Sequence, residues 1–232
     1  MSSTSCGIAM AVVALGVHLS LQRFLSDERP PKSTNAVPSG WGIVNRRDFT
    51  LLSAISVIDS SSRSGFLLLA PFLMIEKGLP VEHVGYAIMV IFAGGAAGKF
   101  ACGFLAERLG TIRTIVITEI ATVAAIAAAI VAPMGVLWVL LAPIGLALNG
   151  TSSALYAAAG ELAHEERRAR TFGLFYTVTT GAGAAAPVAV GALGDAVDLA
   201  LSAAVVAVWV AAAVPIALAL RSRKRDEGRA AG

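Results

Sequence analysis

Residues 103–113 read GFLAERLGTIR, a short polar turn between two long apolar runs at residues 84–106 and 114–132. Each run is long enough to cross a bilayer as a helix, which takes about 20 apolar residues. Arg108 places a charge at the turn, and Gly110 can adopt the left-handed backbone that ends a helix. This stretch therefore predicts two membrane-spanning helices joined by a tight, basic turn.

The composition of the whole chain supports the same fold class. Of its 232 residues, 56% are hydrophobic and 14% are charged, whereas a soluble domain averages about 25% charged residues. Disordered chains are polar and rich in charge, and membrane β-barrels alternate apolar and polar residues, so the long unbroken apolar runs exclude both. We therefore expect an all-α, polytopic transmembrane helical bundle.

About seven membrane spans are expected. The first, at residues 6–25, is the least convincing, because polar side chains crowd its end. The remaining six lie at residues 50–75, 84–106, 114–132, 136–159, 172–193 and 199–220. Their short connections predict three hairpins in sequence. The expected organisation is a first helix at 1–25, a cytoplasmic linker at 26–48, a six-helix bundle at 49–220 and a basic cytoplasmic tail at 221–232.

Lysine and arginine are distributed very unevenly along the chain, and this bias sets orientation. With the C-terminus in the cytoplasm, fifteen of the eighteen basic residues fall on the inner side, and only Lys77 falls in an outer loop. The N-terminus then lies outside, in a plasma or inner membrane. The net charge of +3 reflects this topology, so no nucleic-acid partner is expected.

The turn at residues 103–113 resembles the loop signature of the major facilitator superfamily, G-x-x-x-D-R-x-G-R-R. Glu107 stands where the signature has Asp, and Thr111 replaces a basic residue. Residues 160–170 resemble the loop between the tenth and eleventh helices of these transporters, and residues 187–195 resemble the end of the eleventh.

The resemblance covers roughly residues 46–221. Family members usually have twelve spans in two six-helix halves. This chain resembles the second half, preceded by a helix similar to the sixth. The resemblance implies transport of a small solute by alternating access, driven by an ion or substrate gradient, with protons as the implied coupling ion.

The side chains of the turn have physical roles that can be stated without the family. Gly103 allows two helices to approach closely, and Glu107 can accept hydrogen bonds from a neighbouring helix start. Arg113 joins Arg108 in anchoring the turn at the cytoplasmic side, and Gly110 ends the helix. We assign these residues to gating.

Two ionisable residues lie deep in the span at residues 50–75. Asp59 and Arg63 are four residues apart, so they share a helix face and can pair, and Ser56 lies one turn before Asp59. One interpretation is a coupling site, in which Asp59 binds a proton or a cation and Arg63 holds an anionic group. The other is mutual neutralisation that lets a polar helix insert.

Lys99 and Glu119 form a second possible pair. Each lies ten residues from the centre of the turn near Leu109, so antiparallel helices would place them at one depth. We favour a structural or gating bridge over a substrate role. Alternatively, Lys99 extends to the cytoplasm on its own.

Polar stripes follow two further spans. Asn149, Ser152, Ser153 and Tyr156 share one helix face. In the next span, Tyr176 and Thr180 are one turn apart. Such stripes line a cavity or join helices by hydrogen bonds, and the larger Asn149 and Tyr156 favour a cavity. Small residues such as Gly94-x-x-x-Gly98 predict close helix packing.

No cofactor, metal or enzyme activity is expected, because the three histidines are scattered and no phosphate-binding glycine loop is present. The predicted function is secondary transport of a small solute across the bilayer. Arg63 favours an anion, whereas the alanine-rich walls favour a lipophilic compound. The competing hypothesis is a non-transporting membrane partner, regulatory subunit or inactive fragment. A homodimer or a separate N-terminal half would complete the pathway.

Overall fold

A computed structural model describes residues 40–230 of the chain. The expected first helix at residues 6–25 and most of the linker lie outside the described residues. The described part consists of long helices and one short 3-10 helix, η1. They are α2 (Arg46–Glu76), α3 (Val81–Leu109), α4 (Thr111–Val131), α5 (Met134–Glu161), η1 (Glu165–Arg167), α6 (Arg168–Ala196), α7 (Leu199–Ala211) and α8 (Ala213–Ala230).

The expected all-α transmembrane bundle is confirmed. Five helical stretches of the described chain are both long and apolar enough to cross a membrane: Val81–Leu109, Thr111–Val131, Met134–Glu161, Glu165–Ala196 and Leu199–Ser222. Helix α2, with 31 residues, is also long enough to cross a membrane. It is not among these five because it is more polar, with six serines, Asp59 and Arg63. Its polarity reflects the cavity described below.

The last predicted span, at residues 199–220, is interrupted. Helix α7 ends at Ala211 and α8 begins at Ala213. Pro215 has no N–H to donate to the carbonyl four residues earlier, which is that of Ala211. The missing hydrogen bond accounts for the break at Ala212.

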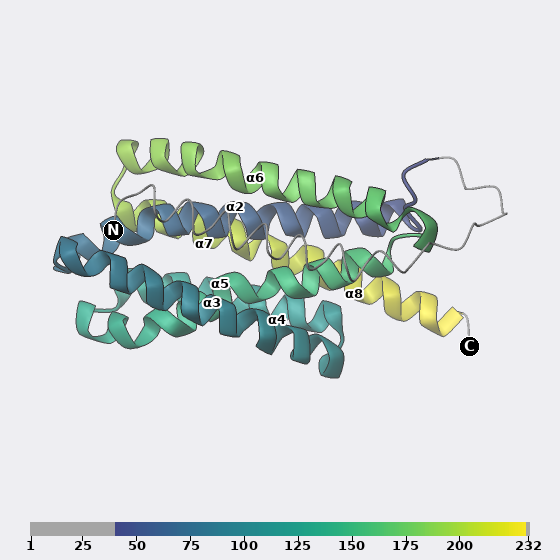
Figure 1. The fold of residues 1–232 in the computed structure, drawn as a ribbon, viewed down its shortest axis with the longest axis horizontal. Helices are drawn as coiled ribbons and strands as arrows, with labels where there is room; N and C mark the ends of the chain where they lie inside the picture. Colours follow the sequence, from purple (N-terminus) through teal and green to yellow (C-terminus); the bar gives the residue numbers. More distant parts are fainter. Residues whose placement is uncertain (1–39, 231–232) are drawn as a thin grey trace, which may run out of the picture. The chain divides into compact units, whose positions relative to one another are not determined.

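Helices that are distant in the sequence make the most extensive contacts. Helix α3 packs along α5, and α2 packs along α6 (Figure 1). Helix α4 packs against α5 and α7. The prediction of three sequential hairpins is therefore wrong for α2–α3 and α6–α7, which touch only briefly, and holds for α4–α5.

Glycines bring α3 and α5 together. A Cβ on Gly94 or Gly98 would collide with the backbone carbonyls of Ala142 and Leu146 on α5, and a Cβ on Gly145 would collide with that of Ile91 on α3. The close packing predicted for Gly94-x-x-x-Gly98 is thus confirmed. Small residues on both helices allow the two backbones to approach.

Gly103 makes no such approach. A Cβ at this position would meet no atom within 4 Å. The expectation that Gly103 brings two helices together is wrong, because Gly103 lies on an open side of α3 while its neighbour Cys102 is buried against α5.

The buried core consists of two apolar clusters separated by a polar layer. On α2, one cluster ends at Ile58 and the other begins at Phe66. The same gap occurs on α4 and α5. We call the buried polar side chains in the gap the polar layer: Asp59, Ser60, Ser62, Thr118, Glu119, Thr122, Asn149, Thr151 and Ser152.

The segment before α2 is hydrogen-bonded to the loop between α5 and α6 and to the first turn of α6. Val44 N–H donates to the Leu162 carbonyl, at 3.0 Å, and His164 N–H donates to the Gly42 carbonyl, at 2.9 Å. Thr171 Oγ1 donates to the Trp41 carbonyl at 2.9 Å. We call residues 40–45 the strap.

Lys77, the basic residue of the outer loops, also has a structural partner. Its Nζ donates to the carbonyls of Ile130 and Ala132 at the end of α4, at 2.7 and 2.8 Å. The last carbonyls of a helix lack intrahelical partners and attract cations. Lys77 therefore joins the end of α2 to the end of α4, which accounts for its place in outer loops that hold no other lysine or arginine.

Paired glycine variants test this packing. We expect Gly145→Ala to lower the thermal unfolding temperature in detergent, because the new methyl group collides with the Ile91 backbone. Gly103→Ala should instead raise stability by up to about 1 kcal/mol, since alanine favours a helix over glycine and the site is open. Equal shifts in the two variants would contradict the α3–α5 contact.

Candidate functional site

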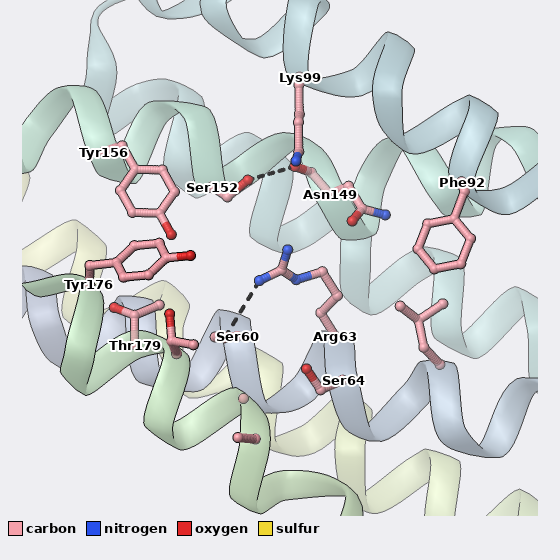
Figure 2. A pocket seen from close by; sticks show the side chains of 14 residues that line it. Ser60, Arg63, Ser64, Phe92, Lys99, Asn149, Ser152, Tyr156, Tyr176 and Thr179 are labelled. Atoms are coloured by element: carbon pink, nitrogen blue, oxygen red, sulfur yellow. Dashed lines mark hydrogen bonds between the residues drawn. The ribbon is translucent and has the colours of Figure 1, made fainter. Parts of the chain in front are cut away.

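A cavity of about 610 Å³ lies beside the polar layer, between α2, α3, α5 and α6 (Figure 2). Polar and cationic side chains make up most of its lining. It is lined by Ser60, Arg63, Ser64, Leu67, Phe92, Lys99, Asn149, Ser152, Tyr156, Tyr176, Thr179, Thr180, Gly183 and Ala184. Each of the four helices contributes, so their packing determines its geometry.

Two cations point into this cavity from opposite walls. Figure 2 shows the Arg63 guanidinium rising from α2 and the Lys99 side chain descending from α3 toward the same space. Arg63 Nη2 donates to Ser60 Oγ at the long distance of 3.5 Å, while Arg63 Nε is buried without a partner. The guanidinium therefore retains free donors.

Aromatic side chains close one end of the cavity. The rings of Tyr156 and Tyr176 lie 6.2 Å apart between centroids, and Tyr156 also packs edge-on against Phe175 at 5.9 Å. The hydroxyls of both tyrosines point toward the centre of the cavity (Figure 2).

Asn149 is held in place by its own helix. Its Nδ2 donates to the Gly145 carbonyl at 3.1 Å, and the amide occupies the space that a side chain on Gly95 would fill. Ser152 Oγ donates to the Asn149 carbonyl at 2.9 Å. The amide oxygen thus faces the cavity from a fixed position.

Two carboxyl groups lie in the polar layer behind the cavity. Asp59 is 4% exposed and Glu119 is fully buried. Neither carboxyl oxygen of Glu119 has a hydrogen-bond partner. The two carboxyls are close enough for their negative charges to repel each other, whereas the Arg63 guanidinium attracts the Asp59 carboxylate.

The cavity brings together five of the seven residues that the sequence predicts for the solute pathway: Arg63, Asn149, Tyr156, Tyr176 and Thr180. The other two lie outside its lining. Ser56 Oγ is hydrogen-bonded to Thr179 Oγ1 at 2.8 Å, which joins α2 to α6. Asp59 is buried among the helices, toward α4.

The predicted bridge between Lys99 and Glu119 is not formed. Lys99 is exposed in the cavity, and Glu119 has no hydrogen-bond partner. The prediction assumed that α3 and α4 form a hairpin with facing side chains. Because α3 packs mainly on α5, Lys99 lies over Asn149 instead (Figure 2).

Sequence reasoning did not identify several cavity residues as pathway residues. Three of them, Ser60, Ser64 and Thr179, lie within one turn of a predicted residue. They did not stand out because α2 and α6 contain many serines and threonines. Phe92 is an isolated aromatic residue on an apolar helix, so no local signal sets it apart.

The turn between α3 and α4 has the predicted backbone. Gly110 ends α3 with φ of +87°, as expected for a glycine terminator. Arg108 stacks over the Phe104 ring at 4.3 Å. Glu107 is exposed and accepts no hydrogen bond among the described residues, so its expected bond to a helix start is absent there. Arg113 is also exposed.

Within residues 40–230, no three His, Cys, Asp or Glu side chains come together as metal ligands. The lining of the cavity offers hydroxyl, amide and cationic groups instead. Such groups suit the binding of a solute by hydrogen bonds and charge.

A comparison with protein families identifies the family of the chain. Residues 50–232 match the profile of the Major Facilitator Superfamily. The chain belongs to this superfamily. A comparison with curated proteins gave no match.

Members of the Major Facilitator Superfamily are membrane transporters, so the chain is a multi-pass membrane protein of a transporter family. The match begins within α2 and includes every helix that lines the cavity. The cavity is therefore part of the domain that defines the family.

Glu119 provides a test of the polar layer. We expect Glu119→Met to raise the free energy of unfolding by about 1–3 kcal/mol, because it removes a buried carboxyl without a hydrogen bond and keeps a chain of similar length. The measurement is reversible unfolding in detergent. Glu107→Met, at an exposed site, should change stability by less than about 0.5 kcal/mol. A loss of stability in Glu119→Met would show that the carboxyl is bonded in the native protein.

Proposed function

We propose that the chain is a proton-coupled secondary transporter that moves a small solute by alternating access. The observation that supports this most directly is the polar cavity of about 610 Å³, bordered by a layer with two buried carboxyls, Asp59 and Glu119. Polar and charged side chains at the middle of membrane-spanning helices cost stability, so their presence around a cavity supports a role in binding a solute.

The proposed pathway crosses an inner membrane, with the N-terminus outside and the C-terminus in the cytoplasm. The distribution of lysine and arginine supports this orientation. Lys77 is the basic residue that falls in an outer loop, and its hydrogen bonds to the end of α4 account for it. In this orientation the α3–α4 turn and the strap both face the cytoplasm.

The coupling step is assigned to Asp59 and Glu119. Two negative charges side by side in an apolar layer are costly, so a pair of neighbouring carboxyls is suited to gaining and releasing a proton. Arg63 interacts with Asp59 and also lines the cavity. A solute near Arg63 would therefore affect the charge balance of the pair.

Four helices of this chain supply the walls of the cavity, and alternating access needs a second bundle that moves against them. A second copy of this chain or a separate N-terminal half would supply it. The intact mass of the protein in its source membrane distinguishes these cases. A mass near 23.7 kDa would indicate a separate partner, and a larger mass would indicate a longer single chain that contains this sequence.

Reconstitution tests the function. Proteoliposomes containing the 232-residue chain should take up a radiolabelled test solute, benzenesulfonate, benzyltrimethylammonium or glucose, faster under an imposed proton gradient than without one. Uptake of none of the three, with or without a co-expressed partner half, would favour the competing hypothesis of a non-transporting membrane partner.

Asp59 is the decisive position for coupling. We expect Asp59→Asn to abolish the part of uptake that depends on the proton gradient, because an amide cannot take up and release the proton. Insertion and helix content, measured by circular dichroism, should be unchanged.

The control for this variant is Asp198→Asn. Asp198 accepts a hydrogen bond from Leu201 N–H at the start of α7, and asparagine can cap a helix equally well. Gradient-dependent uptake should therefore survive in Asp198→Asn. If it also survived in Asp59→Asn, another group would carry the proton.

A further inference from the structure

We infer that the cavity selects small organic anions and that Arg63 and Lys99 together hold the anionic group. This inference rests on the proposed transport function and adds the class of solute. It gives Lys99 a substrate role in place of the structural bridge that the sequence favours.

The first argument is the charge of the lining. Arg63 and Lys99 are the charged residues that line the cavity, and the carboxyls of Asp59 and Glu119 are not part of its surface. A solute inside therefore meets two positive charges and no negative one. In a medium of low dielectric constant this arrangement attracts an anion and repels a cation.

The second argument is the lack of partners for these cations. Among the described residues Lys99 makes no hydrogen bond, and it lies exposed in the cavity. Arg63 has an unpartnered Nε and one long hydrogen bond, to Ser60. A buried donor without a partner, such as Arg63 Nε, is costly, and an anion between the two side chains would supply acceptors for both of them.

The third argument is the position of Asp59. This carboxyl acts on Arg63 from behind the cavity wall, so it offsets part of the arginine charge without occupying the binding space. Lys99 lies on the opposite wall, on α3 (Figure 2). The Lys99 charge has no carboxylate among the lining residues to offset it, and an incoming anion would therefore neutralise it.

The remaining lining suits the organic part of the solute. Phe92 and Leu67 supply an apolar wall, while the hydroxyls of Tyr156 and Tyr176 supply further donors. The solute is thus expected to combine one anionic group with an apolar or aromatic body.

A labelling experiment tests charge selection and does not require the solute to be identified. Thr180→Cys places a thiol in the cavity lining, in a background with Cys6→Ser and Cys102→Ala. The protein, in phosphatidylcholine nanodiscs, reacts with an anionic methanethiosulfonate (the sulfonatoethyl reagent) or a cationic one (the trimethylammonium-ethyl reagent). Each rate is normalised to the rate of the same reagent with 2-mercaptoethanol.

We expect the anionic reagent to react at least about fivefold faster than the cationic one after normalisation, because two positive charges lie within several ångströms of the thiol. Lys99→Gln and Arg63→Gln should each reduce this ratio by roughly twofold or more. Arg47→Gln removes a positive charge from an exposed site outside the cavity lining and should leave this ratio unchanged. Ser64→Cys, also in the lining, serves if Thr180→Cys does not fold.

Equal rates or faster labelling by the cationic reagent would overturn the inference. Failure of both reagents to react would overturn it as well, because no hydrated path would then lead to the cavity. Labelling does not require flux, so charge selection without uptake would contradict the proposed transport and leave the binding preference standing.

Protection experiments distinguish a soluble solute from a lipid headgroup. Benzenesulfonate should slow the labelling of Thr180→Cys, and benzyltrimethylammonium at the same ionic strength should not. Slower labelling only in nanodiscs that contain phosphatidylglycerol would overturn the soluble solute in favour of a lipid phosphate. No protection by benzenesulfonate would overturn the organic anion.

Discussion

The burial of Glu119 between two apolar clusters is the constraint on which the rest of the bundle depends. A fully buried carboxyl without hydrogen bonds is costly, and Asp59 lies close to it. The apolar clusters on either side offset that cost through the packing of large side chains such as Phe66 and Phe175. The polar layer therefore costs stability at Glu119, although its Thr122 joins α4 to α5 by donating a hydrogen bond to the Ala147 carbonyl at 3.0 Å.

The close approach of α3 and α5 has a complementary effect. Their glycine contacts bring the two backbones together in one wall of the cavity, which carries Lys99 and Asn149. The opposite wall, formed by α2 and α6, is joined by the hydrogen bond between Ser56 and Thr179 and by the contact of Gly183 with Ser60. The cavity thus lies between two helix pairs, each of which is tightly packed within itself.

Much of the fold could be predicted from the sequence, because long apolar runs and their basic turns carry a strong and local signal. Gly110, the Gly94-x-x-x-Gly98 face and five residues that line the cavity were identified in this way. The α2–α6 and α3–α5 pairs were not, because they depend on contacts between residues far apart in the chain. The error at Lys99 followed directly from the assumed hairpin. Thr179 was missed since a hydroxyl gives no local sign of its orientation.

The strap has a mechanical consequence. Residues 40–45 are hydrogen-bonded to the loop that ends α5 and to Thr171 in the first turn of α6, and they continue directly into α2. The strap therefore connects α2, α5 and α6 at this end of the bundle. A pull on the chain ahead of residue 40 would act on all three together, so this end of the three helices would move as one body.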